Sequence, residues 1–140
     1  MPNRYAYVAT MAEERQSTVG FGHRIVKLDM AQRASVHHHF GPQRYVGEPI
    51  FVPCQYDAAD DTAADAAATG EEDDGYVLTM VYNKEDKTTA LVILSASDIA
   101  EEPLATIHLP QRVPYGFHGT WIPASSLNPC LLYTSPSPRD

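Results

Sequence analysis

Residues 75–95 read GYVLTMVYNKEDKTTALVILS, and this stretch decides the fold class. The run Gly75–Tyr82 is apolar at most positions, which is typical of a strand with side chains buried on both faces. The polar residues 83–87 then predict a hairpin turn, and Ala90–Ser95 supplies a second apolar run. The stretch therefore predicts two antiparallel strands inside a layered β structure.

The rest of the chain repeats this pattern of short runs separated by turn residues. Further strands are predicted at Tyr5–Met11, His23–Asp29, Ser35–Phe40, Pro49–Pro53, Ala105–Leu109 and Phe117–Ile122. Met11–Gln16 is a short helical candidate, but 11 prolines in 140 residues disfavour long helices. The fold is therefore predicted to be all-β, and the pattern alone leaves a sandwich, a barrel or part of a propeller open.

Composition restricts the classes of function. The chain carries 10 Lys and Arg against 18 Asp and Glu, a net charge of −8, and its 44% hydrophobic content is typical of one globular domain. Because no basic stripe could neutralise phosphates, we expect no nucleic-acid partner. No apolar run approaches the roughly 20 residues of a membrane helix and no secretory signal is apparent, so a cytoplasmic location is expected.

The negative charge is concentrated in residues 57–74, which contain eight acids and no Lys or Arg. This Ala- and Asp-rich stretch has no aliphatic side chain larger than Ala, so it predicts an exposed acidic loop. Carboxylates could hold calcium, but their spacing here does not match an EF-hand loop. The remainder of the chain is neutral.

The final residues, 130–140, read CLLYTSPSPRD and resemble the translation of a sequencing-library adaptor. We expect them to be a non-native scar, which leaves residues 1–129 as native sequence. Cys130 falls within the scar, so no intrachain disulfide is expected. Cys54 is then interpreted as an idle or buried thiol.

Six histidines are the main candidates for chemistry. On a strand, His37 and His39 share one face and His38 takes the other. His37 and His39 could chelate a transition metal, but two ligands do not complete a site, and a polar edge strand with one packed histidine is the alternative. His118 differs because it lies in VPYGFHGTWIP (residues 113–123), where glycines flank an aromatic–histidine pair and prolines bracket the segment.

Several segments, in order, resemble the carotenoid cleavage oxygenases, the family that includes the lignostilbene dioxygenases and the retinal-pigment-epithelium isomerase. The similar segments are RYAYVA at 4–9, GEPIFVP at 47–53, EDDGYVL at 72–78 with LVILSA at 91–96, and RVPYGFHGTWIP at 112–123. Ser95 stands where the family usually has Asp. The resemblance covers nearly all of residues 3–123.

The resemblance implies a seven-bladed β-propeller with an Fe(2+) ion on its axis, bound by four histidines, three of which are hydrogen-bonded by glutamates. His118 matches the last iron ligand, and Glu48 matches one of those glutamates. A neutral imidazole suits Fe(II), and a carboxylate on its second ring nitrogen fixes the tautomer. The implied reaction is cleavage by O2 of a conjugated C=C bond, in an apolar carotenoid, apocarotenoid or stilbene-type substrate, to two carbonyl products.

The other three iron histidines have no match in this chain, and 140 residues cannot close a propeller ring. Residues 1–129 are therefore expected to be the C-terminal blades of a longer enzyme, inactive as an isolated fragment, with any peripheral membrane contact made through the missing parts. Two alternatives stay open. One is a propeller or sandwich interaction module in which His118 is structural, and the other is a small metal protein that uses His37 and His39.

Overall fold

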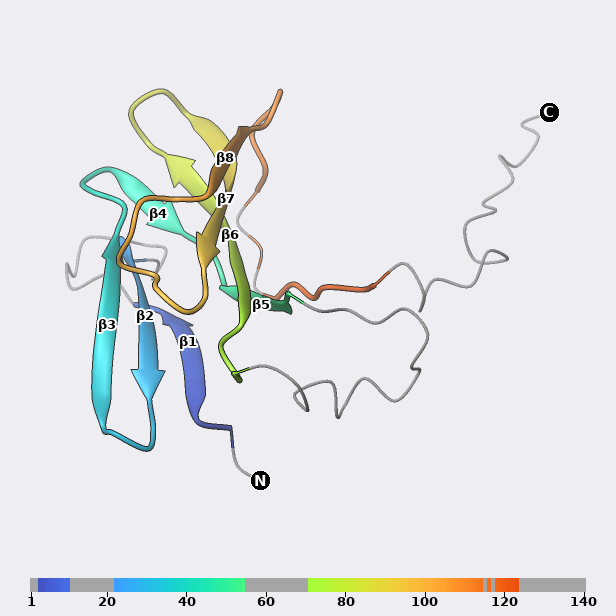
Figure 1. Cartoon of the computed structure of the whole chain (residues 1–140). Coiled ribbons are helices and arrows are strands. Elements are labelled where there is room, and N and C mark those ends of the chain that lie inside the picture. The colour runs from blue at the N-terminus through green and yellow to red at the C-terminus, as the bar shows by residue number, and fades with distance from the viewer. Residues whose placement is uncertain (1–2, 11–21, 55–70, 115, 117, 124–140) are drawn as a thin grey trace.

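The computed structural model describes residues 3–10, 22–54, 71–114, 116 and 118–123, and every regular element within these ranges is a β-strand (Figure 1). The strands are β1 (Tyr5–Ala9), β2 (Arg24–Asp29), β3 (Ala34–His39), β4 (Arg44–Val46), β5 (Ile50–Pro53), β6 (Gly75–Asn83), β7 (Thr88–Ser95) and β8 (Ala105–His108). The predicted all-β class is confirmed. The helical candidate Met11–Gln16 and the expected scar at residues 130–140 lie outside the described residues. Within the described ranges no helix is long and apolar enough to cross a membrane.

The strands form two antiparallel sheets, which lie beside each other in Figure 1. The first sheet has the order β1-β2-β3, and the second has the order β4-β6-β7-β8, with β5 also paired to β6. The β6–β7 hairpin pairs Tyr76 with Ser95 at one end and Asn83 with Thr88 at the other. The polar turn at residues 84–87 joins the two strands, as the sequence predicts.

β4 and β5 form one interrupted strand along the edge of β6. Val46 pairs with Val81, and Ile50 pairs with Leu78, so three residues of the edge strand stand opposite two residues of β6. One extra residue in an antiparallel pair is a β-bulge, which bends the strand and redirects side chains. β4 is not among the predicted strands, because three residues are too few to display an alternating pattern.

The predicted strand at Phe117–Ile122 is wrong over its described part, because residues 118–122 belong to no strand. Its aromatic residues favour a strand, but other features of the segment oppose one. Pro114 and Pro123 have no N–H to donate to a neighbouring strand. Gly119 weakens a strand, and its amide donates to a carboxylate rather than to a backbone carbonyl.

Apolar side chains between the two sheets form the core. Its buried members are Ile25, Phe40, Val46, Val77, Val81, Val92, Leu94, Ala96 and Ile99. Burial of each large aliphatic side chain contributes about 1.5–3 kcal/mol. Tyr7 of the first sheet stacks on Phe51 of the second with ring centroids 5.8 Å apart, and its hydroxyl donates to the carbonyl of Ala96 at 2.9 Å. These contacts join the sheets into one packed unit.

A buried ion pair also links the first sheet to the segment before β6. Lys27 on β2 donates from Nζ to Oδ2 of Asp73 at 2.5 Å and to the carbonyl of Ser97 at 2.8 Å, and both charged side chains are 8% exposed. The expectation of an exposed acidic loop over residues 57–74 is therefore wrong at Asp73, because a buried lysine holds that carboxylate. The other described acids of the loop are exposed, and residues 57–70 lie outside the described part.

Candidate functional site

Glu48 lies in the bulge between β4 and β5. On its N-terminal side, the Gly47 amide donates to the carbonyl of Met80 at 2.8 Å. On its C-terminal side, Pro49 has no N–H with which to continue the ladder. The bulge therefore turns the Glu48 side chain away from the regular strand edge, where 41% of it is exposed.

The described residues after β8 are 109–114, 116 and 118–123, here called the crossing segment. This segment returns across the second sheet, on the face opposite the core, toward β5 (orange in Figure 1). Backbone amides of this segment bond to side chains of the sheet. The Val113 amide donates to Oγ1 of the buried Thr89 at 3.2 Å, and the Gly119 amide donates to Oε2 of Glu48 at 2.9 Å. A Cβ atom at Gly119 would lie 2.9 Å from Cδ1 of Ile50, so the absence of a side chain allows this close approach.

His118 and Glu48 meet at this crossing, although they are 70 residues apart in the chain. Nδ1 of His118 donates to Oε1 of Glu48 at 3.3 Å, while the second carboxylate oxygen accepts from the Gly119 amide. A carboxylate can only accept, so the contact assigns the ring proton to Nδ1. The lone pair of a neutral His118 ring then lies on Nε2, and the side chain is 88% exposed.

The same contacts fix the charge of Glu48. The Gly119 amide, and next the His118 ring, hold the pKa of the Glu48 carboxyl below its ordinary value of 4.5, against an opposing effect of desolvation. Glu48 is therefore ionised at neutral pH. An ionised carboxylate is the form that accepts both hydrogen bonds and orients the imidazole.

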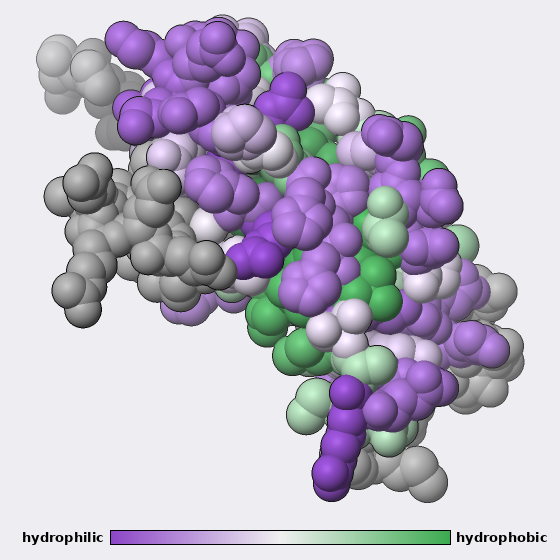
Figure 2. Space-filling model, turned by 90° about the vertical axis from the view of Figure 1, so that its left-hand side faces the viewer, coloured by the Kyte–Doolittle hydropathy of each residue, from purple (hydrophilic) through white to green (hydrophobic). Residues whose placement is uncertain are grey.

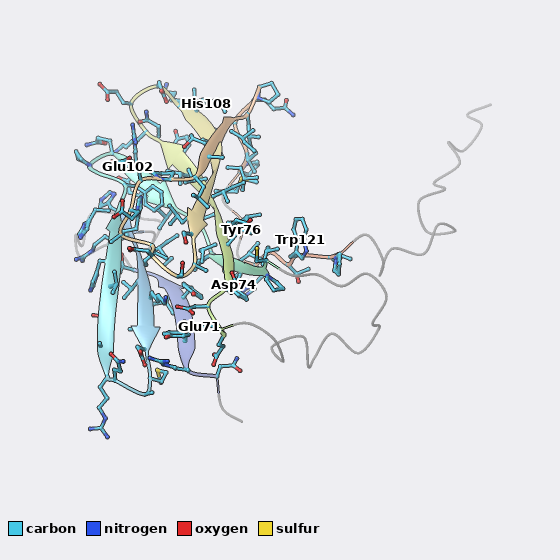
Figure 3. The ribbon with its side chains drawn as sticks, in the orientation of Figure 1. Glu71, Asp74, Tyr76, Glu102, His108 and Trp121 are labelled. Carbon is cyan, nitrogen blue, oxygen red and sulfur yellow. The ribbon has the colours of Figure 1, made fainter. Side chains whose placement is uncertain are left out.

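A cleft of 380 Å³ opens between the crossing segment and the outer face of β6 and β7, and both Glu48 and His118 lie on its wall. Most of the remaining wall is apolar, with Ile50, Leu78, Met80, Leu91, Val113, Pro114 and Trp121 among its residues. Figure 3 labels Trp121 on the segment that follows β8. An apolar cleft with a few polar groups at one point suits an apolar ligand that is held in one orientation.

The donor set of His118 and Glu48 fits one ligand position of an Fe(II) centre. The Nδ1 proton is held by a carboxylate and Nε2 is left as the metal-binding atom, which is the usual arrangement of metal-bound histidines. Within the described residues no group of three or more His, Cys, Asp and Glu could hold a metal ion. His118 could therefore supply only one ligand, and a complete centre would require others from outside these residues.

The other sequence candidates lie elsewhere. His37 and His39 share one exposed face of β3, as predicted, with ring centroids 6.2 Å apart. His38 is buried, where Nδ1 donates to the carbonyl of Ile99 at 2.7 Å, so it is the packed histidine of the edge-strand interpretation. Figure 2 views the molecule from the side on which β3 lies and shows mostly hydrophilic residues around a narrower apolar strip. Cys54 is exposed, which contradicts burial of its thiol.

Two buried threonines belong to this arrangement and were not predicted from the sequence. Thr79 on β6 and Thr89 on β7 are each 2% exposed, and their hydroxyls bond to the Glu48 bulge and to the crossing segment, respectively. The available signal was a hydroxyl inside an apolar strand, because a buried hydroxyl requires a partner. The sequence could not identify which backbone group that partner would be.

The amino-acid sequence is similar to those of known proteins. The sequence profile of the retinal pigment epithelial membrane protein family matches residues 1–123. The apocarotenoid-15,15′-oxygenase of Synechocystis is 34% identical over 121 residues, which are 86% of this chain and 22% of that protein. The chloroplastic 9-cis-epoxycarotenoid dioxygenase NCED6 of Arabidopsis thaliana is 36% identical over 103 residues, which are 74% of this chain and 15% of that protein.

Solved structures agree with the sequence matches. The structure of the cobalt-substituted Synechocystis oxygenase matches with a TM-score of 0.65 at 31% identity, over 86% of this chain and 22% of that one. Structures of that oxygenase are propellers, the architecture that the resemblance implied. The chain spans 15% to 22% of the length of these relatives.

Proposed function

The chain belongs to the retinal pigment epithelial membrane protein family of carotenoid oxygenases, as the sequence resemblance implied, and we propose that it forms part of an Fe(II)-dependent dioxygenase. One observation carries the proposal: the Glu48 carboxylate orients His118 so that Nε2 is available as a metal ligand. Several relatives are named as carotenoid cleavage dioxygenases, which supports oxidative cleavage as the reaction class.

His118 is proposed to hold the iron through Nε2, and Glu48 to keep the Nδ1 proton on the far side of the ring. When bound, Fe(II) supplies the redox chemistry that dioxygen needs in order to react with a C=C bond. The crossing segment contributes by fixing the Glu48 carboxylate through the Gly119 amide. The cobalt-substituted structure of the Synechocystis relative supports a metal-dependent site in this family.

The proposed substrate is an apolar polyene of the carotenoid or apocarotenoid type, with stilbene-type compounds as a further class. The apolar wall of the cleft beside His118 supports an extended hydrocarbon ligand. In the proposed reaction the two oxygen atoms of O2 become the oxygens of two carbonyl products as the C=C bond breaks. Both oxygen atoms and all electrons of the reaction are accounted for, so no added reductant is needed.

We further propose that the two sheets are C-terminal blades of a seven-bladed propeller whose remaining blades supply the other ligands. The isolated 140-residue chain is then inactive. Its location in the cytoplasm, and any peripheral membrane contact of the whole enzyme, stay predictions. The alternative of a non-catalytic interaction module with a structural His118 is not favoured, because the relatives are named as a dioxygenase and an oxygenase of carotenoid-type compounds.

The test uses a chimera in which residues 3–123 replace the segment that they match in the Synechocystis apocarotenoid oxygenase. We expect the chimera to bind iron and cleave an apocarotenoid, and His118→Ala to abolish both. His37→Ala is the matched control, because it removes an exposed histidine on β3 and should change neither. Full iron binding by the His118→Ala chimera, or its loss in the His37→Ala chimera, would contradict the proposal.

A further inference from the structure

We propose that Thr79 is a positioning residue, whose buried hydroxyl fixes the bulge that holds Glu48 against His118. The inference rests on the proposed function, because it assigns Thr79 a role in orienting a metal-binding histidine. Thr79 is among the residues that line the cleft, but its hydroxyl bonds to the Gly47 carbonyl and not to His118 or Glu48. It acts through the peptide group that immediately precedes Glu48.

The geometry places this hydroxyl at the start of the bulge. Oγ1 of Thr79 donates to the carbonyl of Gly47 at 3.1 Å, and the amide of Gly47 donates to the carbonyl of Met80 at 2.8 Å. Neighbouring residues of β6 thus hold the Gly47 residue through both its N–H and its C=O. The next residue along the edge strand is Glu48, where the register of the ladder changes.

The Thr79 hydroxyl is buried, so its hydrogen bond to the Gly47 carbonyl matters for stability. Thr79 is 2% exposed and lies between Val77 and Val81 on the core-facing side of β6, where an aliphatic residue of similar shape would pack without a polar group. Burying a hydroxyl is unfavourable unless it is hydrogen-bonded. A regular strand would not need a side-chain donor at this point, whereas a bulge interrupts the ladder and leaves backbone groups to be satisfied.

The shape of the bulge determines where the Glu48 carboxylate lies. The Glu48 carboxylate accepts from the Gly119 amide and from Nδ1 of His118 only while the bulge keeps its shape. Without the Thr79 hydrogen bond, the Gly47 carbonyl could move and the Glu48 backbone could rotate. The hydrogen bonds of Glu48 to the Gly119 amide and to His118 would then lengthen together. Thr79 therefore controls the direction in which His118 presents Nε2.

The experiment compares Thr79→Val with Thr79→Ser in the chimera, with Thr106→Val as control because Thr106 is an exposed threonine on β8. Hydrogen exchange of the metal-free chimera is read by mass spectrometry on peptides that contain the Gly119 amide. Thr79→Val should accelerate exchange there several-fold and raise the iron dissociation constant about tenfold, the lower end of effects seen when partners of metal ligands are removed. Thr79→Ser keeps the hydroxyl, so its exchange rate and iron dissociation constant should match those of the parent chimera. Thr106→Val should leave both quantities unchanged.

A merely structural role gives a different result. If Thr79→Val accelerates exchange in β6 and β7 as much as at Gly119, or leaves exchange at Gly119 unchanged, the inference is wrong. If Thr79→Val does not fold, Thr79→Ala and Thr79→Ser replace it, because both lack the γ-methyl and only Ser keeps the hydroxyl. The exchange measurement needs no metal, so it decides the role of Thr79 even if His118→Ala shows that the proposed iron site is wrong.

Discussion

The backbone amide of Gly119 donates to Oε2 of Glu48 at 2.9 Å, although the two residues are 71 positions apart. The other oxygen of the same carboxylate accepts from Nδ1 of His118. One side chain from a strand bulge therefore fixes two consecutive residues of the crossing segment. This double contact links the fold of the second sheet to the proposed metal ligand.

Replacing Glu48 with glutamine should weaken iron binding by the chimera about 10- to 100-fold, as expected for the partner of a metal-bound histidine. A glutamine amide has one acceptor oxygen, so it cannot accept from both His118 and Gly119 in the same way. Iron titration followed by metal analysis measures the effect. Glu102→Gln is the matched control, because Glu102 is exposed and lies away from the cleft, and it should bind iron like the parent.

Gly119→Ala should crowd the crossing segment against β5, because the new Cβ would lie 2.9 Å from Cδ1 of Ile50, and the Ile50 side chain or the segment must shift. We expect weaker iron binding by the chimera and faster exchange of the residue 119 amide. Ile50→Val removes the opposing methyl and should recover both properties in the double variant. An unchanged iron affinity in the single variant, or no recovery in the double one, would show that this close approach does not position the site.

Lys27→Met should destabilise the junction of the two sheets by about 3–5 kcal/mol, because it leaves the buried Asp73 carboxylate without its cation. The free energy of local opening at β1 and β2, from hydrogen exchange of the chimera, measures the loss. Lys27→Met combined with Asp73→Leu removes both charges and should recover most of it. Equal destabilisation in the single and double variants would indicate that packing, and not the charge, is responsible.

Acid should loosen the turn between β2 and β3. The Arg4 side chain, followed by backbone amides of the turn, lowers the pKa of Asp29 below its ordinary value of 3.8. A carboxyl with a lowered folded-state pKa stabilises the fold above its unfolded pKa, and this contribution is lost as the pH falls through the folded value. The melting temperature of the parent chimera should therefore approach that of Asp29→Asn below pH 3.8, and a constant difference from pH 6 to pH 3 would contradict this.

The sequence predicted most of the fold from local patterns. The hairpin of β6 and β7 was predictable, because two long apolar runs flank a polar turn. β4 was not, because it has three residues and ends at a bulge whose register depends on β6. The segment at 118–122 was wrongly predicted as a strand, because its aromatic residues fit a strand while its amide at Gly119 is bonded to a distant side chain.

The candidate site was less predictable from patterns. His118 and Glu48 were named from a family resemblance, and no spacing rule brings together residues 70 positions apart. The buried state of Asp73 was also missed, because its neighbours along the chain are exposed acids and its partner Lys27 is distant in sequence. In each case a long-range contact overrides what the adjacent residues indicate.

The most direct test of His118 as an iron ligand is a crystal structure of the iron-loaded chimera with the iron located by its anomalous scattering. We expect iron at bonding distance from Nε2 of His118, with Nδ1 of that ring still donating to Glu48. Iron bound without His118, or a His118 ring turned so that Nδ1 faces the metal, would show that Glu48 does not orient His118 as an iron ligand.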